Sequence, residues 1–158
     1  TAATPQTQSA ELDRMLAEGD RQIALKDAAA ASATFQKVLE KYPNEPRALY
    51  GLAVTAILSG EGQRAQELFE QIVSTSASAA SAPTAPAATA DPSILAWSHV
   101  YLGRIHDLED ERDEAVTEYR AALAINGSPE NARAAAQRGL DSPYNSHAPE
   151  NNSSSHNP

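Results

Sequence analysis

The chain has 158 residues and a formal net charge of −9, and 41% of its residues are hydrophobic but only 5% are aromatic. The negative charge disfavours unspecific nucleic-acid binding, because neutralising phosphates requires clustered Lys and Arg. The sequence has no cysteine, which excludes disulfides and thiolate metal ligands, and no apolar run reaches the roughly 18 to 20 residues of a membrane span. Much of the apolar content is alanine, so the composition favours closely packed helices and predicts an all-α fold.

The first hairpin of helices is predicted after a short polar arm. Residues 1–9 are small and polar, which predicts a flexible N-terminal arm. Residues 10–25 carry apolar side chains at helical spacing, and Asp27 is the expected N-cap of a second helix that ends near Lys41. Gly19 lies inside the first helix, where Gly costs about 1 kcal/mol relative to Ala, so we expect it to mark close packing.

A second hairpin follows directly. Asn44, Glu45 and Pro46 give a cap followed by proline in the first turn of a helix that is predicted to end near Ser59. Its partner helix is predicted from about Gln63 to Val73. Residues 74–90 then contain no charge and no large apolar residue, so we expect this insert to build no core of its own.

A third hairpin is predicted over residues 94–125, after an Asp91 cap and a proline at the first helical position. Ser128 and Pro129 repeat that starting signal for a short alanine-rich helix over residues 131–139, with Gly139 as its expected C-terminal stop. The tail at residues 140–158 has low complexity and is predicted to be disordered. The repeat domain is therefore expected to occupy residues 10–139.

The three hairpins share one register. The first two repeats are offset by 34 residues and the third by a further 50, so the third is displaced by 16 residues, nearly the length of the insert. Four kinds of slot agree at these offsets: a small residue at Gly19, Ala53 and Gly103; an alanine at Ala31, Ala65 and Ala115; an aromatic at Phe35, Phe69 and Tyr119; and an aliphatic at Val38, Ile72 and Ala122.

A 34-residue helical hairpin with these slots resembles the tetratricopeptide repeat family. The resemblance covers roughly residues 12–125, and the helix at 131–139 looks like the family's C-terminal capping helix. The sequence departs from the family at Lys26, which replaces the usual turn glycine, and at three positions where the family often has a large aromatic residue, namely Met15, Leu49 and His99. The resemblance implies three hairpins plus a cap in a short α-solenoid.

The resemblance also implies a binding surface. Partner peptides of the family lie along the concave surface formed by the first helix of each hairpin. By register this surface includes Leu16, Asp20 and Ile23 from the first repeat and, as the main groove residues, Tyr50, Val54, Ile57, Trp97, Tyr101 and Arg104. Trp, Tyr and Arg are enriched at binding hot spots. The alternative is that Trp97 and Tyr101 pack against the insert, the tail or a neighbouring subunit.

One subclass of the family clamps a C-terminal carboxylate with Lys, Asn and Arg. We do not expect that clamp here, because the matching positions hold Leu16, Asp20, Gly51, Trp97 and Tyr101.

The sequence gives little support for catalysis or for a cofactor. His99 and His106 share a helical face, but we expect both to be structural, because no cysteine or spaced carboxylate completes a metal site. The acidic turn at residues 109–114 lacks the ligand spacing and central Gly of a calcium loop. There is also no glycine-rich phosphate loop and no nucleophile elbow. We therefore predict a protein that is not an enzyme and needs neither a metal nor a cofactor.

The predicted function is a scaffold for protein–protein interaction that includes self-association. The alternative is a structural subunit of a self-assembling, O-glycosylated extracellular filament, which would require export of the chain. Ser/Thr-rich segments with Pro suit O-linked sugars, and the candidate acceptors in the insert are Thr75, Ser76, Ser78, Ser81, Thr84 and Thr89. The expected partners are thus a protein or peptide, further copies of the chain and covalent glycans, and neither nucleic acid nor a membrane span is expected.

Overall fold

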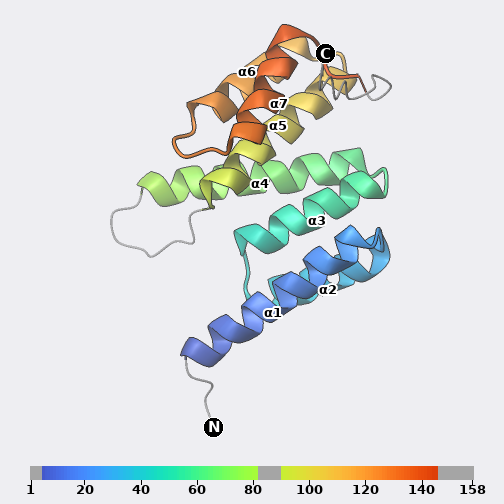
Figure 1. Ribbon diagram of the computed structural model, residues 1–158, viewed down its shortest axis with the longest axis vertical. Coiled ribbons are helices and arrows are strands. Elements are labelled where there is room, and N and C mark those ends of the chain that lie inside the picture. The colour runs from blue at the N-terminus through green and yellow to red at the C-terminus, as the bar shows by residue number, and fades with distance from the viewer. Residues whose placement is uncertain (1–4, 82–89, 146–158) are drawn as a thin grey trace, which may run out of the picture.

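Helices account for all the regular secondary structure that could be described. The computed structural model describes residues 5–81 and 90–145, with the backbone alone for residues 5, 80 and 81. These residues form seven helices and no strand, which confirms the all-α prediction (Figure 1). The helices are α1 (Pro5–Ala24), α2 (Ala28–Lys41), α3 (Pro46–Leu58), α4 (Gly62–Ser81), α5 (Pro92–Leu108), α6 (Arg112–Ala124) and α7 (Glu130–Asp141).

The helices pair as three hairpins stacked along one axis. Helices α1 and α2, α3 and α4, and α5 and α6 form the pairs, and each pair packs on the next through α2 with α3 and α4 with α5. Helix α7 packs on α5 and α6. Helices α1 and α7 therefore lie at opposite ends of a short solenoid (Figure 1).

Two predicted helix starts are confirmed by their caps. The Asp27 carboxylate accepts a hydrogen bond from the backbone N–H of Ala30 at 3.0 Å, and the Asp91 carboxylate accepts one from Ser93 at 2.7 Å. Such caps satisfy donors that the first turn of a helix cannot satisfy itself. The helix that follows the insert therefore begins at the capped position that the sequence predicts.

Two helices are longer than predicted. Helix α1 begins at Pro5 rather than near residue 10, so about half of the predicted arm is helical. Helix α4 continues past Val73 to Ser81, into the predicted insert. Alanine favours helices and the first proline after Val73 is Pro83, so this sequence has no residue that would stop α4 earlier.

The start and end of α7 also differ from the prediction. Pro129 is the N-cap, and the Ser128 hydroxyl, predicted to cap this helix, is buried without a hydrogen-bond partner among the described residues. Helix α7 runs through Gly139 to Asp141. A side chain at Gly139 would overlap the Tyr119 ring, so Gly139 provides close packing rather than a helix stop.

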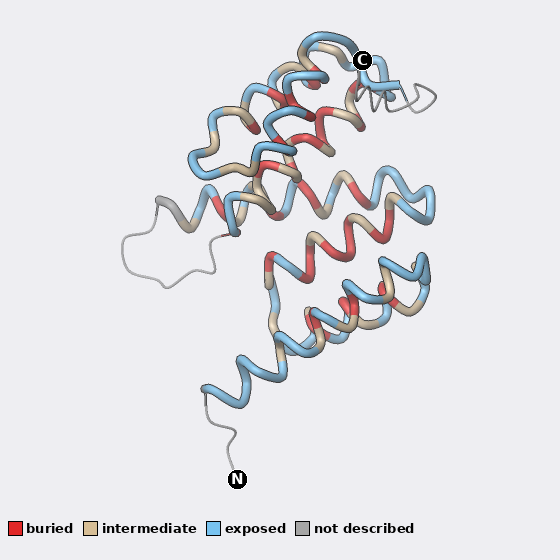
Figure 2. The backbone as a smooth tube through the Cα atoms, viewed as in Figure 1, coloured by how far each residue is buried: buried red, intermediate tan, exposed pale blue. Residues whose placement is uncertain are grey.

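The core is built from the predicted slots. Phe35, Phe69 and Tyr119 have no exposed surface, and neither do the alanines at Ala31, Ala65 and Ala115. Burial follows the faces along which the hairpins meet (Figure 2). The small-residue slot is also confirmed, because a Cβ atom at Gly19 would lie 2.5 Å from the Phe35 ring and one at Gly103 would lie 2.6 Å from the Tyr119 ring.

The turns within the hairpins follow the same register. Lys26, Gly60 and Asp110 have φ angles of 59°, 76° and 62°, and they are separated by the repeat offsets of 34 and 50 residues. Left-handed backbone favours glycine. Lys26 and Asp110 nevertheless adopt this conformation although they have side chains. The turn geometry is kept even where the glycine is absent.

Candidate functional site

The first helix of the second hairpin and that of the third each keep one accessible edge, and we call these edges together the stripe. Most of α3 is buried between hairpins, and its accessible residues lie along one edge of the helix. Tyr50, Val54 and Ile57 are half-buried along this edge. On α5 the half-buried residues Trp97, Tyr101 and Arg104 recur at helical spacing. We call these six residues the groove residues. Leu16, assigned to the same surface by register, is instead 1% exposed and belongs to the core beneath it.

An aromatic cluster joins α3 and α5 across this stripe. The Tyr101 ring stacks on Phe69 with centroids 5.0 Å apart and planes 6° apart, and Tyr50 meets the edges of both rings at 6.0 and 6.4 Å. Trp97 lies beside Tyr101 at 6.1 Å. Val54 and Ile57 pack against the same core cluster. The structure thus brings Tyr50, Trp97 and Tyr101 together and anchors them on a fully buried ring.

Arg104 lies between two tyrosine rings. Its guanidinium carbon is 5.7 Å from the centroid of Tyr101 and 4.8 Å from that of Tyr144. Within the described part of the chain, no carboxylate pairs with it and none of its N–H groups donates a hydrogen bond. A cation over the face of an aromatic ring is attracted by the ring without losing its charge. Within the described residues Arg104 is therefore a cation that contacts two rings and has no carboxylate partner, at the α5 end of the groove.

Tyr50 lies close enough to Arg104 to be affected by its charge. Burial raises the pKa of the Tyr50 phenol well above its usual value, Tyr101 raises it further, and Arg104 acts in the opposite direction. The phenol therefore stays neutral and able to donate a hydrogen bond at any physiological pH. The groove consequently combines a neutral phenol and a guanidinium in one apolar setting.

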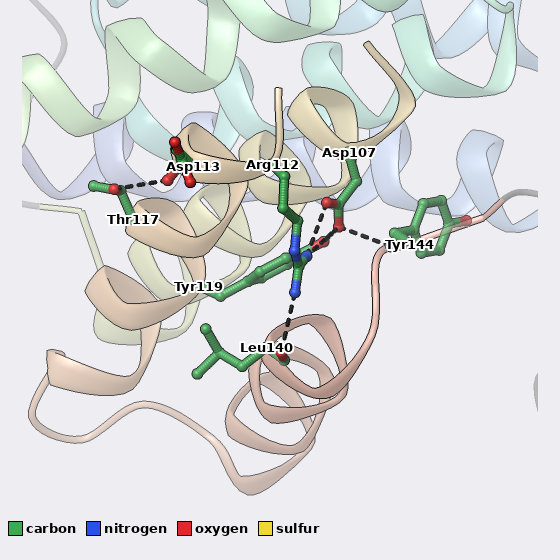
Figure 3. Close-up of polar contacts among 7 residues, drawn as sticks. All are labelled: Asp107, Arg112, Asp113, Thr117, Tyr119, Leu140 and Tyr144. Atoms are coloured by element: carbon green, nitrogen blue, oxygen red, sulfur yellow. Dashed lines mark hydrogen bonds and ion pairs between the residues drawn. The ribbon is translucent and has the colours of Figure 1, made fainter. Parts of the chain in front are cut away.

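The chain after α7 is held against α5 by a buried carboxylate. The Asp107 side chain is fully buried and pairs with Arg112 at 2.9 Å. It also accepts hydrogen bonds from the Tyr119 hydroxyl at 2.8 Å and from the Tyr144 backbone N–H at 2.7 Å (Figure 3). Arg112 donates in turn to the Leu140 carbonyl at 3.0 Å. This network places the Tyr144 ring on Arg104.

Sequence reasoning did not identify Asp107 or Tyr144 as part of the site. Asp107 lies in the last turn of a helix, where a carboxylate is expected to be solvated. Tyr144 is the one aromatic residue in the predicted tail, and that isolation in a polar segment was the available signal. Their contact joins positions 37 residues apart, and no repeat offset predicts it.

Each of the two histidines of α5 contacts a glutamate. The Nδ1 atom of His99 lies 2.6 Å from Glu118 and that of His106 lies 2.7 Å from Glu111, and both ring side chains are 14% exposed. His106, Glu109 and Glu111 could bring three ligand atoms within 4.8 Å of one another. Glu109 and Glu111 are exposed residues in the turn before α6. Solvated turns often contain such carboxylates without binding an ion. We assign no role in binding to this cluster.

The candidate modification residues are divided between α4 and the chain outside the described residues. Thr75, Ser76, Ser78 and Ser81 lie in α4. Ser76 is 8% exposed, so the folded chain gives an enzyme little access to its hydroxyl. Thr84 and Thr89 lie outside the described residues. O-glycosylation of all six residues stays a prediction.

Comparison with known proteins identifies the repeat. Residues 22–82 match the tetratricopeptide repeat family, a span that runs from the end of α1 through α4. No curated protein matches the chain. The third hairpin lies outside the matched span, but it carries the same slots at the same depth in the core. None of the described helices has the length and apolar character needed to cross a membrane.

Proposed function

Because residues 22–82 match the tetratricopeptide repeat family, we propose that the chain is a non-enzymatic scaffold that binds an extended segment of a partner protein in the groove of α1, α3 and α5. Tetratricopeptide repeats generally mediate protein–protein interaction. The observation that carries the proposal for this chain is the set of half-buried aromatic residues around Arg104. Such residues offer a partner a large area at a small entropic cost, because their neighbours already hold them.

Trp97 is the best residue for testing the site. Tyr101 stacks on the fully buried Phe69, so its removal would disturb the core as well as the groove. Trp97 contacts Tyr101 and packs against the core cluster of the third hairpin, while part of its side chain stays exposed. Replacing Trp97 leaves the stack of Tyr101 on Phe69 in place, which replacing Tyr101 would not.

The test is selection from a displayed library of random twelve-residue peptides on the full chain. We expect the wild type to enrich a family of peptides and Trp97→Ala to bind them at least tenfold more weakly, because truncated hot spots typically cost about 2 kcal/mol or more. The matched control is Glu67→Ala, an exposed change on α4, which should bind like the wild type. The absence of any enriched peptide, or equal binding by Trp97→Ala, would count against this groove.

Self-association is a second candidate, with the filament subunit as its extended form. Among the described helices only α2 and α3 contact α1, which leaves its remaining face open to a neighbouring subunit, and repeat hairpins stack readily through such faces. Three leucines are also exposed at the ends of the first helices: Leu25 (68%), Leu58 (51%) and Leu108 (54%). Both features would be covered in an assembly. Glycans would add to the intact mass of native material above 16.7 kDa.

A further inference from the structure

One row of the groove changes its charge from end to end. Asp20, Val54 and Arg104 occupy the same slot in α1, α3 and α5, because they are separated by the repeat offsets of 34 and 50 residues. We call them the charge row. Asp20 is exposed, and Val54 and Arg104 are half-buried. The row therefore presents an anion, an apolar side chain and a cation on three successive helices.

A neighbouring row shows what happens when opposite charges lie on adjacent helices. Asp13 of α1 and Arg47 of α3 occupy equivalent slots 34 residues apart, and they form an ion pair with each other at 3.2 Å. Their charges are compensated within the protein. In the charge row Val54 lies between the two charges, and within the described residues neither Asp20 nor Arg104 has an oppositely charged partner.

The surroundings of each charge leave it available to a ligand. Arg21, the residue next to Asp20, pairs with Glu18 at 2.8 Å and so does not neutralise Asp20. Arg104 lies over the rings of Tyr101 and Tyr144, and these contacts stabilise the guanidinium without neutralising its charge. Asp107, a buried carboxylate one turn further along α5, is engaged by Arg112 and Tyr119.

From this arrangement we infer that the groove selects a partner segment with one basic and one acidic residue on either side of an apolar residue. The basic residue binds at Asp20, the apolar residue at Val54 and the acidic residue at Arg104. Packed helices lie about 8 to 10 Å apart, so the row spans about 16 to 20 Å. An extended segment rises about 3.3 Å per residue, which separates its two charges by about five or six residues. This inference rests on the peptide-binding function proposed above.

The test uses single charge reversals in the same twelve-residue library. We expect the wild type to enrich peptides with one basic and one acidic residue at that spacing. Asp20→Arg should enrich peptides with two acidic residues, and Arg104→Glu should enrich peptides with two basic residues. Because both reversals change the required charges rather than their order, the result does not depend on which way the peptide chain runs. All preferences should weaken as salt is raised.

Controls separate this inference from the proposed function. Glu67→Arg is an exposed reversal on α4 and should leave the selected pattern unchanged. Thermal unfolding monitors whether each variant folds. If Arg104→Glu unfolds, Arg104→Gln replaces it, because this change removes the charge alone. The Arg104→Gln variant should lose the preference for an acidic residue in the peptide and keep the preference for a basic residue. Enrichment of peptides with the same charges by the wild type and both variants overturns the charge row while the groove stands. A wild type that enriches no peptide overturns both.

Discussion

Asp107 is far more buried than a carboxylate near the end of a helix is expected to be. It lies in the last turn of α5, yet its carboxylate is fully buried and binds groups from α6 and from the chain after α7. A buried carboxylate is stable only when its acceptor positions are satisfied. The Tyr119 hydroxyl is thereby fixed, and burial together with the hydrogen bond to Asp107 raises the pKa of that phenol above its usual value. Asp107 therefore ties the third hairpin to the C-terminal cap.

We expect Asp107→Asn to destabilise the protein by about 3 kcal/mol in chemical denaturation, at the lower end of the cost of breaking a buried ion pair, because Arg112 is partly exposed. The amide keeps the shape of the side chain but removes the charge that pairs with Arg112. The matched control is Asp110→Asn, an exposed position with a φ of 62°, where Asn is well tolerated. A difference of less than 0.5 kcal/mol between the two variants, roughly the scatter of surface substitutions, would show that the network adds little.

At the scale of the elements, the first junction between hairpins and the junction with α7 each depend on an aromatic ring opposite small residues. The Phe35 ring of α2 lies between Gly19 of α1 and Gly51 of α3, and a Cβ atom at either glycine would overlap it. The Tyr119 ring of α6 lies in the same way between Gly103 of α5 and Gly139 of α7. Each of these rings is fully buried and cannot move aside without opening the core.

Gly51→Ala tests this packing because two effects oppose each other. Replacing Gly by Ala inside a helix normally stabilises it by about 1 kcal/mol, whereas overpacking a filled core costs about 1 to 3 kcal/mol. Since the new methyl group would overlap a ring with no exposed surface, we expect a lower melting temperature. Gly62→Ala in α4 has nothing within 4 Å of the added atom and should leave the melting temperature unchanged or raise it. A stabilised Gly51→Ala protein would contradict the packing described here.

The elements were largely predictable, and the reasons are local. Asp27 and Asp91 carry their capping function in their own side chains, and the slots at Phe35 and Phe69 repeat at one offset. The length of α4 was missed because a run of Ala and Ser resembles a linker in composition although alanine favours a helix. Groove residues such as Trp97 could be assigned by register. Tyr144 could not, because the contact that places it depends on how the chain turns after α7.

For the whole molecule, the two ends of the solenoid differ. The C-terminal end is closed by α7, which packs on α5 and α6, whereas α1 at the other end contacts only α2 and α3 among the described helices. A stack of copies would join these two unlike ends, and head-to-tail contacts of this kind continue into filaments unless they close into a ring. The exposed leucines offer a different, lateral edge.

Light scattering over a range of concentrations distinguishes these modes of association. We expect the full chain to form assemblies that grow with concentration. Deleting residues 1–9 or 142–158 should abolish them if the ends are joined, while Leu58→Ser together with Leu108→Ser should abolish them if the lateral edge is used. A monomer of constant mass at every concentration would rule out both modes and leave peptide binding as the function.

The two junctions between hairpins also differ in the motion that they permit. At the first, Phe35 is enclosed by glycines on both sides, so sliding one hairpin past the next would drive the ring into backbone. At the second, Tyr101 takes the slot equivalent to Gly51 and lies flat on Phe69. Flat rings can shift parallel to their planes with little loss of contact, a shear of the kind seen between packed helices. Changes in the curvature of the solenoid should therefore concentrate between α3 and α5, so that the groove can widen or narrow beside Trp97 while its α1 end keeps its shape.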